Sequence, residues 1–308
     1  MSSARAFAVT SRLALTTTAL MFLLIVIGSV VRTTGSGLAC PDWPLCNGQL
    51  IPPMQFNVMI EWLHRLVALF VSLLLVATVA WVFAHRPVRA RLGGLAGLSV
   101  LLLFTQILLG ALTVWKLLAP GIVSAHLGVA LMLFAALLTL ALSARANADD
   151  APAPPADRGL AGLFGFATFL IFAQAMLGGA VSTTGAGNAC PDWPACNGAW
   201  FPPLEGAVGL QMIHRYGAYA LLAVMLLVLV RSRASADPVI RAGGGMLFAL
   251  TMTQAMFGIL NVLMGVPVWM SAVHLGTAAA LLAMGVGLTF LAATPALSPV
   301  RGGAEAAA

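Results

Sequence analysis

The chain has 308 residues, of which 61% are hydrophobic and 8% are charged, and its mean hydropathy is +1.00. A soluble domain carries about 25% charged residues, so this composition excludes an ordinary soluble enzyme and a disordered protein. The apolar residues come in blocks of about 20, which is the length of a bilayer-spanning helix. We therefore expect an all-α polytopic membrane protein that is surrounded by lipid and has no nucleic-acid partner, despite its net charge of +6.

Eight apolar blocks follow one another along the chain. In chain order, we predict helices over residues 13–31, 58–84, 92–115, 121–143, 161–181, 207–231, 243–266 and 268–293. The first block is too long, and too polar where it ends, to resemble a cleaved signal peptide. We expect it to be retained as a helix.

Basic residues predict the orientation of these helices. Of the 15 Lys and Arg, eleven fall in segments on one side, namely Arg5, Arg12, Arg86, Arg89, Arg91, Arg145, Arg158, Arg231, Arg233, Arg241 and Arg301. The other four are Arg32, Arg65, Lys116 and Arg215. The positive-inside rule then places both termini in the cytoplasm. We expect a multi-pass protein of the inner (cytoplasmic) cell membrane, with its basic pI explained by topology.

An internal repeat divides the chain. Residues 33–48 are TTGSGLACPDWPLCNG and residues 183–198 are TTGAGNACPDWPACNG, an offset of 150. We predict an N-terminal half at 1–146, a polar, Pro-rich cytoplasmic linker at 147–160 and a C-terminal half at 161–308. Because each half has an even number of helices, we expect two tandem four-helix bundles related by a pseudo-twofold axis along the membrane normal.

The four cysteines form one pair in each half, Cys40 with Cys46 and Cys190 with Cys196. Both pairs lie in loops that the charge rule places outside, where disulfides persist. Zinc is the competing interpretation, but its cysteine pairs are usually two to four residues apart, and no histidine lies nearby. We favour a local disulfide in each loop. It can be a structural staple or a labile, redox-sensitive bond, and the sequence does not separate these roles.

Four of the five histidines lie inside predicted helices, one to two turns from the outer end. They are His64, His126, His214 and His274, whereas His85 lies in an inside loop. Ionisable side chains inside a bilayer are costly and usually face the bundle interior. A single such histidine can be explained by a hydrogen bond to a neighbouring helix. Four at a matched depth, two per half, indicate functional sites.

The chemistry of two facing histidines favours haem. Zinc needs three or four protein ligands, and each half offers two histidines and at most one carboxylate. Haem needs only axial ligands and suits an apolar four-helix bundle. We therefore predict one bis-histidine haem site per half. Arg65 and Arg215 follow a histidine near the outer surface, where a guanidinium can pair with haem propionates; snorkelling to the lipid headgroups explains them equally well.

The halves differ three residues before the first histidine, where Glu61 in one corresponds to Gln211 in the other. Residues i and i+3 share a helix face, so Glu61 is expected to face the same cavity as His64. An acid near a helix start is also favoured by the helix dipole. A carboxylate can move protons or stabilise positive charge, which an amide cannot do. We therefore place the reaction centre in the N-terminal half.

With these motifs, the chain resembles the haem A synthases, membrane enzymes of cytochrome oxidase biogenesis. The resemblance covers residues 10–295 and rests on GSGLACPDWPLCNG, EWLHR and SAHLG in the first half. In the second half it rests on GAGNACPDWPACNG, QMIHR and SAVHLG. The cysteines resemble the subgroup with a pair in each half. The resemblance implies oxidation of the C8 methyl group of haem O to a formyl group by successive hydroxylations.

Carried over by motif, the resemblance implies that His64 and His126 flank the substrate haem O. It further implies that His214 and His274 ligate a haem b cofactor and that Glu61 is the essential acid. A haem O synthase and an electron donor that the sequence does not identify are implied as partners. The oligomeric state stays open, a homo-oligomer included.

A haem held by two histidines has no free position for O₂. Either His64 or His126 dissociates during turnover, or the methyl group is oxidised by electron removal with water as the oxygen source. Two other classes remain: a di-haem electron-transfer protein, which normally places its haems at two depths, and a haem carrier. Neither class predicts the difference between Glu61 and Gln211.

Overall fold

The computed structural model describes residues 2–53, 55–148 and 157–294, and within this part the chain forms eight α-helices. Their bounds are α1 Ser3–Thr33, α2 Phe56–Ala84, α3 Arg86–Trp115, α4 Pro120–Ala146, α5 Arg158–Thr183, α6 Gly206–Arg233, α7 Pro238–Leu263 and α8 Val268–Ala293. A short 3₁₀ helix, η1 (Ala186–Asn188), lies in the second cysteine loop. Each α-helix is long and apolar enough to cross a membrane, so the predicted all-α, multi-pass fold is confirmed.

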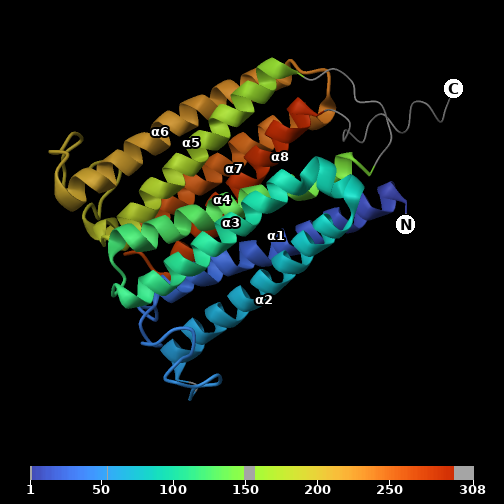
Figure 1. The fold of residues 1–308 in the computed structure, drawn as a ribbon. Coiled ribbons are helices and arrows are strands. Elements are labelled where there is room, and N and C mark those ends of the chain that lie inside the picture. The colour runs from blue at the N-terminus through green and yellow to red at the C-terminus, as the bar shows by residue number, and fades with distance from the viewer. Residues whose placement is uncertain (1, 54, 149–156, 295–308) are drawn as a thin grey trace.

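The helices lie side by side along a common direction (Figure 1). In the first half, α1 contacts α2, α2 contacts α3, α3 contacts α4, and α4 contacts α1. The helices α5 to α8 repeat this ring of neighbours. Consequently α2 and α4 are diagonal to each other, and so are α6 and α8. The pseudo-twofold axis and the limits of the two halves stay predictions.

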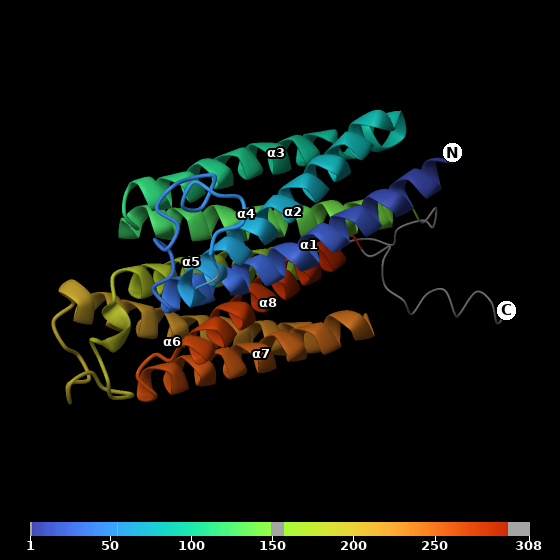
Figure 2. The same ribbon diagram turned by 90° about the horizontal axis from the view of Figure 1, so that it is seen from below.

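The two rings meet along a seam, which we define as the contacts of α1 and α4 with α5 and α8. Figure 2 shows α3 and α7 at opposite edges of the molecule, with α1 and α8 between them. The seam is tightly packed, because a Cβ added to Gly179 would lie only 2.9 Å from Leu127. At one end of the seam, the Ser124 and Thr183 hydroxyls are 3.0 Å apart. This places the two halves in direct contact rather than separated by lipid.

Both cysteine loops lie at one end of the helices, and the N-terminus lies at the other (Figure 1). Of the eleven arginines that the sequence assigns to the cytoplasmic side, nine lie within about two turns of a helix end on the N-terminal side, and Arg12 lies in the third turn of α1. Arg301 lies outside the described residues, as do residues 149–156 of the predicted linker. The positive charge is therefore concentrated away from the cysteine loops.

Several helices begin earlier than hydropathy predicts. The helix α1 begins at Ser3 rather than at residue 13, and α7 begins at Pro238 rather than at residue 243. The reason is local capping: the Ser2 hydroxyl accepts from Arg5 N–H, and an Asp237 carboxylate oxygen accepts from Val239 N–H. Such caps satisfy backbone donors that a helix start leaves unpaired. Charged turns outside the apolar block can therefore still be helical.

Candidate functional site

The four intramembrane histidines line one cavity. Each lies within about two turns of one end of its helix, on the side of the molecule where the cysteine loops lie. His64 on α2 and His126 on α4 are on diagonal helices of the first ring, and His214 on α6 and His274 on α8 are on diagonal helices of the second. All four border a cavity of about 1200 Å³ that extends across the seam. The structure thus brings the predicted histidines together in two matched pairs.

Each imidazole ring packs against a glycine on the neighbouring helix. A Cβ added to Gly28 would lie 3.3 Å from His64 Cε1, and one added to Gly178 would lie 3.0 Å from His214 Cε1. The same contact recurs at 3.2 Å between Gly110 and His126, and at 3.0 Å between Gly258 and His274. Every histidine is therefore seated against bare backbone, and any larger residue at the glycine would displace the ring.

Glutamine side chains provide polar contacts to three of the rings. The Gln106 amide nitrogen lies 3.3 Å from His126 Nε2, and the Gln254 amide nitrogen lies 3.4 Å from His274 Nε2. The amide of Gln174 donates to His214 Nδ1 at 3.0 Å and to the His214 carbonyl at 2.7 Å. Sequence analysis missed Gln174. The repeat could have revealed it, because the equivalent residue in the first half is Leu24.

The predicted disulfides are present in both loops, Cys40–Cys46 and Cys190–Cys196. Within the described part of the chain, no cysteine is free. The sulfur atoms are bonded to each other, and this removes the thiolates that a zinc site would need. The zinc alternative for these cysteines is therefore wrong in this structure.

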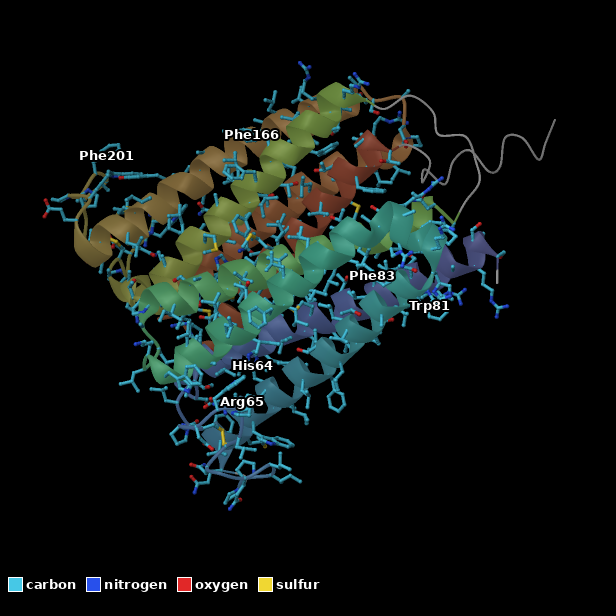
Figure 3. The ribbon with its side chains drawn as sticks, in the orientation of Figure 1. His64, Arg65, Trp81, Phe83, Phe166 and Phe201 are labelled. Atoms are coloured by element: carbon cyan, nitrogen blue, oxygen red, sulfur yellow. A yellow bond between two sulfur atoms is a disulfide. The ribbon has the colours of Figure 1, made fainter. Side chains whose placement is uncertain are left out.

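An arginine next to a histidine anchors each cysteine loop. Arg215 donates to the carbonyls of Ala195 and Cys190, both at 2.7 Å. Arg65 donates from Nη1 to the carbonyls of Asp42 and Leu45, and from Nη2 to that of Cys40. Figure 3 shows Arg65 beside His64, at the end of α2 opposite to Trp81 and Phe83. Each loop is thus tied to the helix that carries a predicted haem ligand.

Glu61 is buried and lies in this anchor as well as on the cavity wall. Its Oε1 accepts from Arg65 Nη2 at 2.5 Å, and its Oε2 accepts from the backbone N–H of Cys40 at 2.8 Å. The Oε1 of Gln211, the counterpart in the second half, is buried without a hydrogen-bond partner among the described residues. The acid therefore has two donors fixed on it, whereas the amide has none on its oxygen.

The four terminal N–H groups of Arg65 are consumed by these contacts, two on each nitrogen. A propionate role for Arg65 stays a prediction that requires one of these bonds to open. Arg215 uses only two of its terminal N–H groups in the described contacts. The two arginines that the sequence treats as equivalent thus differ in how many donors they can still offer.

Haem fits the residues that line the cavity. The Nδ1 atoms of His64, His126 and His274 are buried without a hydrogen-bond partner among the described residues, and such a group costs about 1–3 kcal/mol when left unpaired. Small-molecule pockets occupy roughly 300–1,000 Å³, and this cavity is larger. No cluster of three or more His, Cys, Asp or Glu that could hold a metal ion occurs in the described ranges. Pairs of histidines suit a metal whose remaining ligands come from a porphyrin.

The fold and the site define a multi-pass helical membrane protein with two histidine pairs around a shared cavity. Residues 11–286 match the sequence model of the family described as cytochrome oxidase assembly protein (COX15-CtaA). The match spans most of the chain, and the chain belongs to this family.

Three relatives are named heme A synthase. The protein from Symbiobacterium thermophilum is 34% identical over 255 residues, which are 80% of this chain and 83% of the relative. The protein from Shouchella clausii is 35% identical over 71% of this chain and 74% of its own length. The protein from Methylobacterium nodulans is 30% identical over 86% of this chain and 87% of its own length.

The glycine contacts predict a test of the histidine seats. Replacing Gly178 by Ala would place a methyl group 3.0 Å from His214 Cε1. If the second pair binds haem, we expect the purified variant to lose most of the haem from that pair. Gly162→Ala on the same helix is the matched control, because nothing lies within 4 Å of its added Cβ. Both changes improve helix propensity by about 1 kcal/mol. Equal haem content in the two variants would contradict the seating role.

The hydrogen bonds of Asp42 predict how this carboxylate protects the first disulfide from reduction. The N–H groups of Gly48 and Asn47 donate to Asp42 and hold the pKa of that carboxyl below its usual value. The stabilisation of the loop by this carboxylate is therefore complete at neutral pH and is lost as the pH falls through the lowered pKa. We expect Asp42→Ala at pH 7 to speed reduction of Cys40–Cys46 by an added dithiol, and to leave Cys190–Cys196 unchanged. Unaltered reduction rates would contradict this.

Proposed function

We propose that this protein is a haem A synthase, which oxidises the C8 methyl group of haem O to a formyl group and supplies haem A to cytochrome oxidase. The observation that carries this proposal is the pair of half-buried histidines in each half, bordering one cavity, in a chain of this family. A carrier of haem would bind haem O and release it unchanged. Co-expression with a haem O synthase and chromatography of the extracted haems distinguishes the two, because only the enzyme yields haem A.

In this proposal the two pairs have different tasks. His64 and His126 hold the substrate haem O, and His214 and His274 hold a haem b cofactor. The support is the asymmetry beside the first histidine of each pair, where the first half has an acid and the second half has an amide. A proton-handling group is needed where a methyl group is oxidised and is not needed at a haem that only transfers electrons.

The second pair is also better fixed. Gln174 holds His214 from both its ring and its carbonyl, while His64 has the apolar Leu24 at the equivalent place. A permanent cofactor is served by a ligand that is held still. A substrate that must enter and leave is served by a ligand with fewer constraints, and this supports assigning haem O to the first pair.

The bound porphyrin iron would supply the redox chemistry, and the residues of the chain bind, orient and protect the reacting edge. Glu61 is held by the guanidinium of Arg65 and the N–H of Cys40, which fix the position of its carboxyl group. A carboxylate in that position can accept a proton or stabilise positive charge that develops on the ring. The largely apolar lining of the cavity would limit the access of bulk water to a bound porphyrin.

We further propose that the protein lies in the cell membrane with both termini in the cytoplasm. The arginines at the N-terminal end of the helices support this orientation. It places the two disulfides on the outer, oxidising side. A haem O synthase and an electron donor would act as partners, and a homo-oligomer is compatible with the apolar outer surface.

Glu61→Gln tests the acid. We expect haem to stay bound but haem A formation to fall by at least about 100-fold, the usual contribution of a general acid or base. The measurement is chromatography of haems extracted from the purified variant after co-expression with a haem O synthase.

The matched control is Gln211→Glu, which places an acid beside the second pair and should leave the haem A yield unchanged. A wild-type haem A yield from Glu61→Gln would contradict the catalytic role. An equal loss in Arg65→Lys, with Glu61 intact, would indicate that the loop anchor rather than the acid is required.

Removal of single histidines tests the assignment of the two pairs. We expect His64→Ala or His126→Ala to abolish the formation of haem A and the binding of haem O. Both variants should still bind haem b. His214→Ala or His274→Ala should remove haem b from the purified protein. Haem type is measured on extracts, and total haem by the Soret absorbance of each variant. Loss of haem b after removal of His64 or His126 alone would contradict the assignment.

A further inference from the structure

Arg32 is a cation in the last turn of α1 that borders the same cavity. It has no carboxylate within 4 Å among the described residues, where the Arg65–Glu61 pair is the one salt bridge. Its Nη1 donates to the carbonyl of Ser182 on α5, across the seam, at 2.6 Å. An ionisable side chain held in a membrane helix without an acid is costly and marks a functional position.

The position of Arg32 relates it to the first histidine pair. Gly28, against which the His64 ring lies, is four residues earlier, and residues i and i+4 share one helix face. Arg32 is therefore one turn outward from the seat of His64. In the second half, the residue one turn outward from Gly178 is Ser182. The first site thus has a guanidinium where the second has a hydroxyl.

The two sites differ in how many guanidinium N–H groups are free to bind a ligand. In the first half, Glu61 and three backbone carbonyls occupy the four terminal N–H groups of Arg65. In the second half, Gln211 takes the place of the acid, and Arg215 retains terminal N–H groups outside its two carbonyl contacts. Without Arg32, the first site would have no guanidinium able to receive an anionic ligand group through its terminal nitrogens.

We propose that Arg32 binds a carboxylate arm of the porphyrin substrate at the first site. The proposal rests on the proposed function and deepens it. A haem O propionate has the charge and the planar geometry that a guanidinium recognises through two parallel hydrogen bonds. Arg32 has the free N–H groups for this, since one of its five serves Ser182. Arg32 is a binding residue that orients the porphyrin, and the contact to Ser182 fixes the guanidinium at the seam.

The test compares two probes, iron protoporphyrin IX and its dimethyl ester, in which both propionates are neutral. They are titrated optically into the purified full chain carrying His214→Ala and His274→Ala, so that only the first site binds. We expect the free acid to bind at least about tenfold tighter than the ester, as a charge-assisted hydrogen bond predicts. Arg32→Ser, which introduces the residue of the second half, should remove this preference. The two probes can partition differently into detergent, but this difference is the same for the chain with Arg32 and for Arg32→Ser. It therefore cancels when the ratio of the two affinities is compared between these chains.

Two variants keep the test decisive if Arg32→Ser weakens the fold. Arg32→Gln retains a donor for the Ser182 carbonyl without the charge, and it should also lose the preference for the free acid. Arg32→Lys should retain part of it. The matched control is the chain with His64→Ala and His126→Ala, where only the second site binds and Arg32→Ser should leave the preference unchanged.

A wild-type preference for the free acid in Arg32→Ser or Arg32→Gln would overturn the proposal, and Arg32 would then only cap the C-terminus of α5. An equal loss of affinity for both probes would overturn it as well, because it indicates a structural role. These outcomes are independent of the proposed function. If extracts contain haem A but Arg32 does not distinguish the probes, the enzyme assignment stands and this inference fails.

Discussion

An imidazole inside a membrane must be enclosed by protein, because lipid offers it no hydrogen-bond partner. This chain meets that requirement with glycine, which lets each ring lie against the backbone of a neighbouring helix. The ring of helix contacts keeps α2 and α4 diagonal, so that His64 and His126 border open space rather than each other's helices. The positions of these four imidazole rings therefore determine where the cavity lies along the helices and how near it is to the cysteine loops.

Hydropathy and the repeat were sufficient to predict the eight helices, the cysteine pairs and the matched histidines, because each is a property of local sequence. The starts of α1, α3 and α7 were predicted too late, since averaged hydropathy falls when arginines enter a helix. At the start of α1 the capping signal was present in Ser2, yet it lies eleven residues before the start of the apolar block at residue 13. Gln174 was missed because it is a single polar residue in an apolar helix, visible only by aligning it with Leu24.

The contact between Glu61 and Arg65 illustrates what a sequence can and cannot supply. Their i,i+4 spacing is favourable for an ion pair and was available from the start. The third member of the network, the N–H of Cys40, could not be predicted. It depends on the path of the loop between α1 and α2, which closes a disulfide and brings the N–H of Cys40 to Glu61, 21 residues later in the chain. Only the folded loop shows that the acid beside His64 also anchors the disulfide.

Near the histidines, the two halves differ at polar positions, such as Glu61 against Gln211 and Arg32 against Ser182. The glycine seats, the disulfides and the arginine anchors recur in both halves, so the scaffold is the same. Glu61 adds a negative charge to the first site and at the same time occupies Arg65. A site that binds an anionic porphyrin then needs a positive charge from elsewhere, and α1 provides Arg32. In the proposed arrangement, Glu61 and Arg32 are thus coupled requirements, because a carboxylate that occupies Arg65 leaves the first site without the free N–H groups that Arg215 retains at the second site.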